Sequence, residues 1–394
     1  MRSKDICSTS DDLQLLLSFA LIIVQLTVKE SIKISIFIII IQLILLLYKF
    51  ITNKIIINSI VCIYSIFCIV ILYLSIFQAN KEFFWGNFYS IGLGVVLLLI
   101  NININVVSLN KKIFVALIIM AAIMNFEAIN KFIELYFFKG YTNVEVYKNM
   151  FELQFGKSNA LGLWFVALIC MLLEYKEYII ARIFILLSVF SMLALVSKST
   201  IVIFVLMLLI RNRNKIKFFK NVSFVLIPAT FICVYNTNVI DSLLKILRVN
   251  NAYDLNDLSS GRIEIYLGLI RNIDLKTLFL GKGLGNIVYN NSNICAHNLF
   301  LQIILTTGLI GLTVFIILNY LIFCRLRKYR NIDIFRDDVF IIFLCAFLSA
   351  QVEPGFFTGS KINSFMWIII GIALSKSIYK MSYLIKCNAV EGVE

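Results

Sequence analysis

The chain contains one histidine among 394 residues, and its position suits acid–base chemistry. His297 precedes Asn298 and a long apolar run, so we expect it to lie where a helix begins. The positive end of a helix dipole disfavours an imidazolium, and a neutral ring can accept a proton. We therefore take His297 as a candidate general base. An interfacial histidine that only caps a helix remains the alternative.

A candidate anion-binding arginine precedes the histidine in the same loop. Arg262 follows the polar stretch 254–260 and opens a predicted helix that runs to about Asn272. A cation in a first helical turn opposes the dipole, which suits anion binding better than stability, although a solvated surface charge is the alternative. Arg271 lies half a turn out of phase with Arg262, so we expect it to face headgroups or solvent.

A second candidate cation interrupts an apolar stretch. The segment from Ala181 to Ile210 is too short for two ordinary membrane spans and too long for one, and its break falls at 197–200. A lysine costs roughly 3 kcal/mol at the centre of a bilayer and much less near an interface. We therefore predict a tight hairpin of two short spans that puts Lys198 at the outer rim of the bundle.

Other polar features of the chain predict no metal or cofactor site. The glycine-rich stretch 281–285 lacks the spacing of a nucleotide-binding loop, and we expect a turn that allows close backbone approach. The acidic residues near it show no spacing typical of a glycosidase pair. The nine cysteines form no paired CxxC pattern, so we expect most of them to pack within spans. Glu127, near the end of an apolar run, is expected either to extend its carboxylate to the membrane surface or to hydrogen-bond within the bundle.

The elements that must position these residues are membrane helices. Hydrophobic residues make up 61% of the chain, whereas soluble domains have roughly 45–50% apolar residues. The continuous apolar runs exclude the alternating strands of a membrane barrel. We predict an all-α, polytopic integral membrane helical bundle that forms a single domain over 1–394. Its twelve expected spans are 13–28, 32–48, 55–77, 86–107, 113–133, 160–173, 179–196, 200–210, 222–239, 298–323, 339–352 and 364–378.

Charge sets the expected orientation. If the amino terminus is in the cytoplasm, most of the Lys and Arg residues in short loops fall on the cytoplasmic side. An even number of spans places both termini on that side. The basic clusters 211–220 and 325–336 are then topology anchors. We expect the basic residues behind the net charge of +14 to interact with anionic lipid rather than with nucleic acid. We expect no cleavable signal peptide, because no small-residue cleavage pattern follows the first apolar run.

Two long loops fall on the opposite, outer face. They cover 134–159 and 240–297, and the second carries both Arg262 and His297. Long irregular connections in compact proteins are usually functional. We therefore expect a large periplasmic loop that holds the active site.

Four motifs in this order resemble the bacterial O-antigen polymerase and O-antigen ligase superfamily. They are FGKSNALG at 155–162, which contains Asn159; SKST at 197–200, where Lys198 stands in the place of the family's usual arginine; SGRIEIY with Arg262; and AHNLFLQIILTTGLIG with His297 and Asn298. Lysine keeps the charge of arginine but loses its bidentate geometry. The resemblance covers most of the chain as topology.

The resemblance implies a metal-independent, inverting glycosyltransferase of the bacterial cell inner membrane that needs no cofactor. Its donor would be an oligosaccharide on undecaprenyl diphosphate. Lys198 and Arg262 would bind the diphosphate and stabilise it as it leaves, and His297 would deprotonate the acceptor hydroxyl. Asn159, Asn298 and Arg271 are secondary candidates for the site. The implied partners are the lipid-linked oligosaccharide, membrane lipid and a chain-length regulator protein.

Three functions remain open at this point. A polymerase in polysaccharide biosynthesis transfers the growing glycan to the next lipid-linked repeat unit, and the diverged, isoleucine-rich sequence favours it. A ligase of lipopolysaccharide biosynthesis would transfer the glycan to lipid A-core. A polysaccharide flippase or transporter would instead place charged residues along a path through the spans, often with related halves.

Overall fold

The computed structural model describes residues 2–28, 32–52, 55, 57–76, 81–104, 109–141, 146–147, 150–153, 156–195, 197–212, 262–283, 288–289, 292–293, 296–330, 334–351 and 361–375. At some helix ends, including Lys198 and Asn159, only the backbone is described. This part of the chain is mainly helical, and its helices share one large apolar core.

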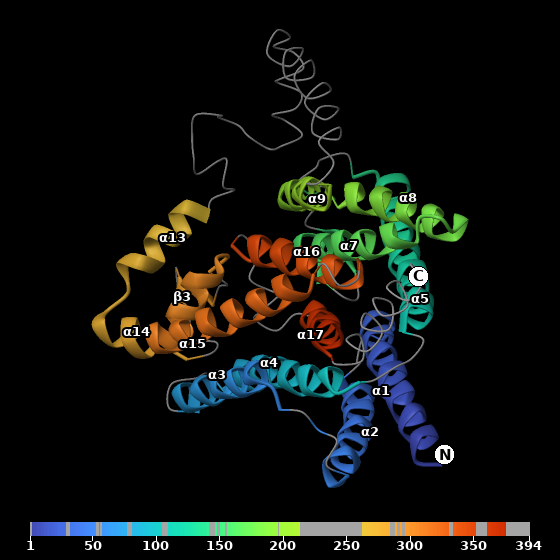
Figure 1. Cartoon of the computed structure of the whole chain (residues 1–394). Helices are drawn as coiled ribbons and strands as arrows, with labels where there is room; N and C mark the ends of the chain where they lie inside the picture. The colour runs from blue at the N-terminus through green and yellow to red at the C-terminus, as the bar shows by residue number, and fades with distance from the viewer. Residues whose placement is uncertain are drawn as a thin grey trace.

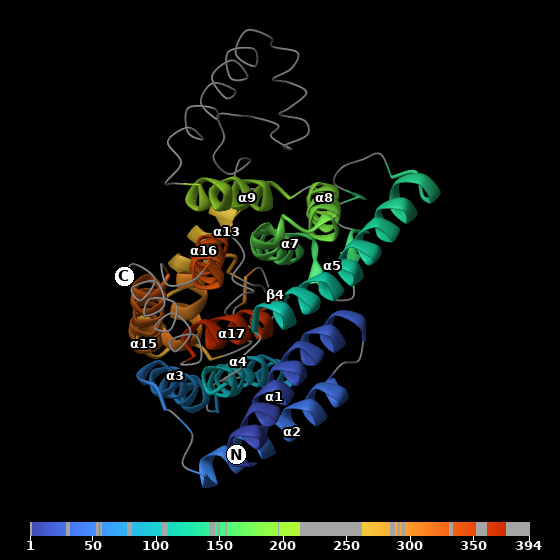
Figure 2. The same cartoon turned by 45° about the vertical axis from the view of Figure 1, so that its right-hand side comes forward.

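Figures 1 and 2 show how the helices are arranged. They are α1 Arg2–Thr27, α2 Ile32–Ile51, α3 Ser59–Ile76, α4 Lys81–Ile102, α5 Leu109–Ile133, the π-helix η1 Glu134–Phe138, α7 Ser158–Leu172, the 3₁₀ turn η2 Leu173–Tyr175, α8 Ile179–Ala194, α9 Lys198–Arg211, α13 Arg262–Arg271, α14 Leu275–Leu280, α15 Leu299–Tyr329, α16 Ile334–Ser349 and α17 Lys361–Leu374. The strands are β1 Glu152–Leu153, β2 Gly156–Lys157, β3 Val288–Tyr289 and β4 Ser292–Asn293, paired β1–β2 and β3–β4 in antiparallel register.

Eleven of the twelve predicted spans overlap helices at their described residues, and the remaining one, 222–239, lies outside the described residues. By length and composition, four stretches among the described residues are able to cross a membrane: Ser10–Thr27, Lys33–Ile51, Lys111–Phe138 and Leu299–Tyr329. The other apolar stretches whose side chains are described cover only 10–17 residues each, fewer than a straight span needs. The all-α membrane class is therefore supported, whereas the twelve-span bundle is not confirmed.

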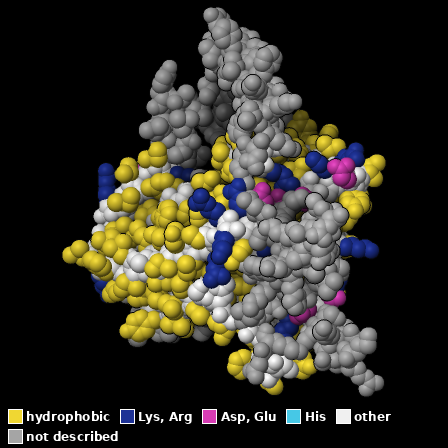
Figure 3. All heavy atoms as spheres, viewed as in Figure 1, with side chains coloured by type: hydrophobic (Ala, Val, Ile, Leu, Met, Phe, Trp, Pro, Cys, Tyr) yellow, Lys and Arg dark blue, Asp and Glu magenta, His cyan; other side chains and the backbone are white. Residues whose placement is uncertain are grey.

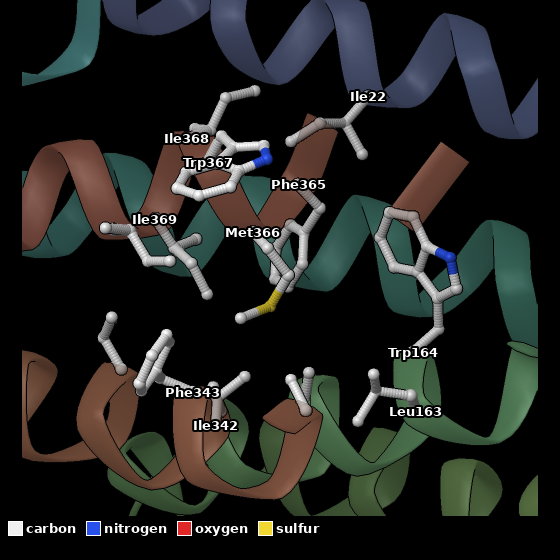
Figure 4. Packing of buried hydrophobic residues seen from close by; sticks show 14 of the residues in the cluster. Ile22, Leu163, Trp164, Ile342, Phe343, Phe365, Met366, Trp367, Ile368 and Ile369 are labelled. Carbon is white, nitrogen blue, oxygen red and sulfur yellow. The ribbon is translucent and has the colours of Figure 1, made fainter. Parts of the chain in front are cut away.

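The centre of the bundle is formed by α7 and α17. Every described side chain from Leu161 to Leu172 and from Asn363 to Leu374 is buried, as expected of helices that are apolar on all sides. Figure 4 shows Ile22 of α1, Leu163 and Trp164 of α7 and Phe343 of α16 around the side chains of α17. Far-separated segments of the sequence thus share one core.

Small residues let α4 and α17 approach closely. A Cβ atom added to Gly94 would lie 2.3 Å from Oη of Tyr64 and 2.7 Å from the ring of Trp367. The Tyr64 and Trp367 rings contact each other with their centroids 4.3 Å apart and their planes tilted by 34°. Gly371 of α17 meets Asn101 of α4 in the same way. Packing through small residues is typical of membrane helices, which gain little from hydrophobic burial against each other.

Large apolar side chains also cover the outside of the bundle. Phe37, Ile44, Tyr73, Leu186 and Tyr320 are each more than half exposed. Figure 3 shows hydrophobic side chains spread over much of the described surface on one face, with Lys and Arg gathered at its margins. A soluble protein rarely exposes such an expanse, so this surface suits contact with lipid.

The predicted hairpin around Lys198 is wrong in its geometry. The break itself is confirmed, because α8 ends at Ala194 and α9 begins at Lys198 with Ser197 as its N-cap. The two helices do not lie side by side, however (Figures 1 and 2). α8 packs against α5 and α7, whereas α9 packs against α7 and α16. Both helices therefore pack on the buried helix α7 rather than on each other.

The predicted span 298–323 is broken at Gly308. This residue has φ 64° and ψ −167° inside α15, a combination that is essentially restricted to glycine. The break exposes the carbonyl groups of Leu305 and Thr306, which accept hydrogen bonds from the backbone N–H groups of Lys282 at 2.7 Å and Gly283 at 3.0 Å. The close backbone approach predicted for 281–285 is thus confirmed at its described residues, and its partner is α15.

The basic clusters contain buried side chains, which the interpretation as topology anchors did not predict. The guanidinium of Arg211 pairs with Asp338 and donates to the carbonyl of Cys170 at 2.8 Å, and Glu174 lies 3.6 Å away. Arg336 is fully buried and donates to the carbonyls of Ala373 and Ser375. These arginines join helix ends, because a guanidinium can satisfy terminal carbonyl groups that have no partner within the helix.

Substitution Gly308→Ala is expected to lower the unfolding free energy by about 2–4 kcal/mol, because alanine strains the backbone and its Cβ would lie 2.1 Å from the carbonyl oxygen of Phe279. Thermal unfolding in detergent measures this change. The control is Gly92→Ala, where no atom lies within 4 Å of an added Cβ. Equal unfolding midpoints for the two variants would contradict the broken helix.

Substitution Asp338→Leu or Arg211→Met alone is expected to cost roughly 3–5 kcal/mol, because each leaves a buried charge of the other sign without its main partner. The double variant should recover most of that loss in the same unfolding assay. Asp12→Asn is the matched control, since its pair with Lys112 is partly exposed and such pairs contribute about 0–1 kcal/mol. Additive losses in the double variant would contradict a direct pair.

Candidate functional site

The described part of the predicted outer loop 240–297 packs against the first half of α15. α13 and α14 are joined by a short turn, and α14 lies along α15 at the Gly308 break. Leu269 of α13 is buried against Ala296, Leu301 and Leu305, and these four residues form a small apolar core of their own. The loop is therefore held on the bundle by side-chain packing as well as by backbone hydrogen bonds.

His297 lies in the tight turn that leads into α15, as the sequence predicted. Its φ is 51°, and it is the one non-glycine residue with positive φ among the residues that the structure describes. Left-handed backbone at a non-glycine residue costs roughly 1–3 kcal/mol and persists only where the surroundings impose it. The imidazole is half-buried. Strain of this kind is concentrated at functional sites, and here it falls on the candidate base.

Hydrogen bonds on both sides impose this conformation. The N–H of Ala296 donates to Oε1 of Gln302 at 2.8 Å, and the hydroxyl of Tyr266 donates to the carbonyl of His297 at 2.8 Å. The N–H of Leu299 donates to the carbonyl of Ala350 at 3.0 Å. The histidine turn is thus tied to α13, α15 and the end of α16.

Asn298 is the N-cap of α15. Its Oδ1 accepts the N–H of Leu301 at 3.0 Å, and its Nδ2 donates to the carbonyl of Gln351 at 3.3 Å. One amide side chain therefore starts the helix and joins it to the segment after α16. The resemblance suggests Asn298 as a site residue, and the structure gives it a structural role beside His297.

Arg262 and Arg271 lie on opposite faces of α13, as their spacing predicted. α13 begins at Arg262 and ends at Arg271. Arg262 is half-buried and one helical turn before Tyr266, so both residues share the face that meets His297. Arg271 is exposed at the far end of the helix. The structure thus brings the Arg262 face of α13 to the histidine turn and leaves Arg271 away from it.

Lys198 and Asn159 are placed by their backbones alone. Lys198 is the first residue of α9, and Asn159 lies in the first turn of α7. These two helix starts lie together, because Thr200 occupies the space where a side chain at Gly162 would extend. The two motifs that carry Lys198 and Asn159 are therefore neighbours in space.

The orientation of α9 and α16 relates Lys198 to His297. Both helices lead away from the Arg211–Asp338 ion pair, which joins the end of α9 to the start of α16. Lys198 is thirteen residues from that pair along α9, or about 20 Å, and Ala350 is twelve residues from it along α16, or about 18 Å. Because Ala350 bonds to Leu299, Lys198 and His297 both lie away from the end of the bundle where the ion pair is.

α14 carries the glycine-rich turn and is capped by Asp274. The Oδ1 atom of Asp274 accepts a hydrogen bond from the N–H of Thr277 at 2.8 Å. Hydrogen bonds from the side chain and backbone of Thr277 lower the pKa of the Asp274 carboxyl below its ordinary value. The cap is therefore present above the ordinary aspartate pKa and is lost as the pH falls through the lowered one.

Sequence reasoning missed Tyr266, Gln302 and Gln351. All three form hydrogen bonds with the histidine turn. Tyr266 and Gln351 are distant from it in the sequence, and Gln302 lies within the helix that follows it. For Tyr266 there was one signal, its spacing of four residues from Arg262 on a predicted helix. Nothing in the sequence indicated which carbonyl its hydroxyl would reach.

The arrangement combines a half-buried imidazole with a cation-bearing helix face and two further helix starts at the same end of the bundle. Such a set can remove a proton from a hydroxyl group and bind an anion. Among the described residues, no group of three His, Cys, Asp or Glu side chains could hold a metal ion. Models of known protein families give no match to the chain, and neither do curated protein sequences.

Substitution Asn298→Ala is expected to cost about 1 kcal/mol of helix stability through loss of the N-cap, whereas Asn298→Ser should retain most of the cap. Hydrogen exchange of the amides at 299–303 measures this, and the alanine variant should exchange faster in that segment. Equal exchange in the two variants would contradict the assigned cap.

Proposed function

We propose that the protein is an O-antigen, or related surface polysaccharide, polymerase of the bacterial inner membrane. It transfers the growing glycan from undecaprenyl diphosphate to the next lipid-linked repeat unit on the periplasmic face. The observation that carries this proposal is the hydrogen bond from Tyr266 to His297, because it joins the Arg262 face of α13 to the one histidine of the chain.

In the proposed reaction, His297 takes the proton from the acceptor hydroxyl as its oxygen attacks the anomeric carbon of the donor glycan. The bond between that carbon and the diphosphate oxygen breaks, and the configuration inverts. Arg262 and Lys198 bind the diphosphate and stabilise the negative charge that it carries away. No metal takes part in this scheme. Twelve spans and both termini in the cytoplasm complete the proposed arrangement.

The ion pairs at the ends of the apolar stretches support this threading. Lys49 pairs with Asp11, Lys112 with Asp12, and Arg211 with Asp338, and each pair joins two ends that the charge bias assigns to the cytoplasm. On the other side, the N–H of Leu299 reaches the carbonyl of Ala350, which joins two ends assigned to the outer face. The same orientation puts His297 where a lipid-linked sugar is exported.

An apolar groove between α15 and α16 supports a lipid-linked substrate. It has a volume of about 400 Å³ and its wall is almost wholly apolar. Phe300, next to the histidine turn, lines one part, and Tyr320 and Phe323 of the second half of α15 line another. Because the groove runs from the candidate site along a membrane helix, it suits a polyprenyl chain whose diphosphate lies at His297.

The buried charges do not favour a transporter. Lys49, Arg211 and Asp338 lie at helix ends, each in an ion pair. A transport path would place charges along the middle of the spans. A ligase would use the same site with lipid A-core as its acceptor, so the acceptor is left to experiment.

Substitution His297→Ala is expected to lower the rate of chain extension by a factor of roughly 10²–10⁴, since the acceptor hydroxyl would lose its base. The readout is glycan length on a gel from a deletion strain complemented with each variant. Lipid-linked repeats should accumulate on the outer face. Lys276→Gln, an exposed cation of α14, is the matched control and should restore normal chains.

The deletion strain itself distinguishes the alternatives. Lipopolysaccharide with a single repeat unit would support a polymerase. Core-only lipopolysaccharide would indicate a ligase instead, and repeats trapped on the inner face would indicate transport. Normal chains in the His297→Ala strain would contradict the enzymatic proposal altogether.

A further inference from the structure

The backbone of His297 is bent against its own preference by two neighbouring side chains. Its φ of 51° requires support. The hydroxyl of Tyr266 donates to its carbonyl oxygen at 2.8 Å, and Oε1 of Gln302 accepts the preceding N–H, that of Ala296, at 2.8 Å. The backbone is therefore held by one side chain at the N–H of the preceding residue and by another at the carbonyl of His297 itself.

The two supporting side chains belong to different elements. Gln302 lies in the second turn of α15, the helix that His297 precedes, whereas Tyr266 lies on α13 and is separated from His297 by 31 residues. The Tyr266 ring packs against the small core of Leu269, Ala296, Leu301 and Leu305. Its hydroxyl thus has a fixed direction, and removing the hydroxyl leaves the ring packing in place.

We infer that Tyr266 and Gln302 are positioning residues. They hold the His297 turn so that its imidazole keeps a fixed position relative to the Arg262 face of α13. Tyr266 is one turn from Arg262 on the same face. A shift of α13 along the bundle would therefore move the cation and break the hydrogen bond to the histidine together. This inference rests on the proposed function for its catalytic meaning, but the coupling of Tyr266 to His297 is a property of the fold.

A purely structural tyrosine would stabilise the loop without affecting the orientation of the imidazole. The single histidine of the chain separates the two cases, because a protein purified without a histidine tag and labelled with [¹³C,¹⁵N]histidine has one imidazole signal. That signal reports the surroundings of His297 with no need for substrate.

The experiment compares Tyr266→Phe with the wild type and with Tyr178→Phe, a control at a residue that is 58% exposed. All three are measured in lipid nanodiscs by the histidine signal and by extension of lipid-linked repeat units. We expect Tyr266→Phe to shift the signal and lower kcat by about 10- to 100-fold with little change in KM, because misplacement of a reacting group acts on the chemical step. The control should match the wild type.

A second pair guards against a folding defect in Tyr266→Phe. Gln302→Glu keeps an oxygen acceptor for the N–H of Ala296, and Gln302→Leu removes it. We expect the signal and kcat to be retained in the first variant and altered in the second.

The outcomes separate this inference from the proposed function. An unchanged histidine signal in both Tyr266→Phe and Gln302→Leu would overturn the positioning role, whatever the activity. A shifted signal with unchanged kcat would overturn its relevance to the reaction. A wild-type protein that extends no repeat units would refute the proposed function. A shifted histidine signal in Tyr266→Phe would still support the coupling of Tyr266 to His297 in that case.

Discussion

The arrangement depends on one constraint: a backbone N–H or C=O group in hydrocarbon needs a partner within the protein. At Gly308 the helical hydrogen bonds of α15 are interrupted, and the freed carbonyls of Leu305 and Thr306 accept the amides of Lys282 and Gly283. This docks α14 on a membrane helix. Because a short turn joins α14 to α13, the same contact fixes the helix that carries Tyr266 and Arg262.

At the opposite end of the bundle, two guanidinium groups meet the same requirement, one of them buried and the other partly buried. Arg336 satisfies the terminal carbonyls of α17, and Arg211 joins α7, α9 and α16 through Cys170 and Asp338. These contacts fix the directions in which α9 and α16 leave that end. The candidate residues at their other ends, Lys198 and the histidine turn, therefore depend on packing that is about 20 Å away.

The sequence predicted the helices and the start of α15 at His297 because both are encoded locally, by apolar length and by an N-cap residue. It also predicted α13 and the opposite faces of Arg262 and Arg271. It failed where the outcome depends on distant segments. A glycine such as Gly308 is tolerated in many unbroken membrane helices, α9 packs on α7 rather than on α8, and the Tyr266 hydroxyl reaches a carbonyl in another element.

The central claim is that a diphosphate-bearing lipid binds beside His297 with Arg262 as a ligand. The most direct measurement titrates undecaprenyl diphosphate into nanodiscs that contain the histidine-labelled protein and follows the single imidazole signal. We expect a saturable shift for the wild type, and a shift that is lost or needs far more lipid in Arg262→Gln. A signal that the carrier lipid does not move, or that moves equally in both proteins, would contradict the claim.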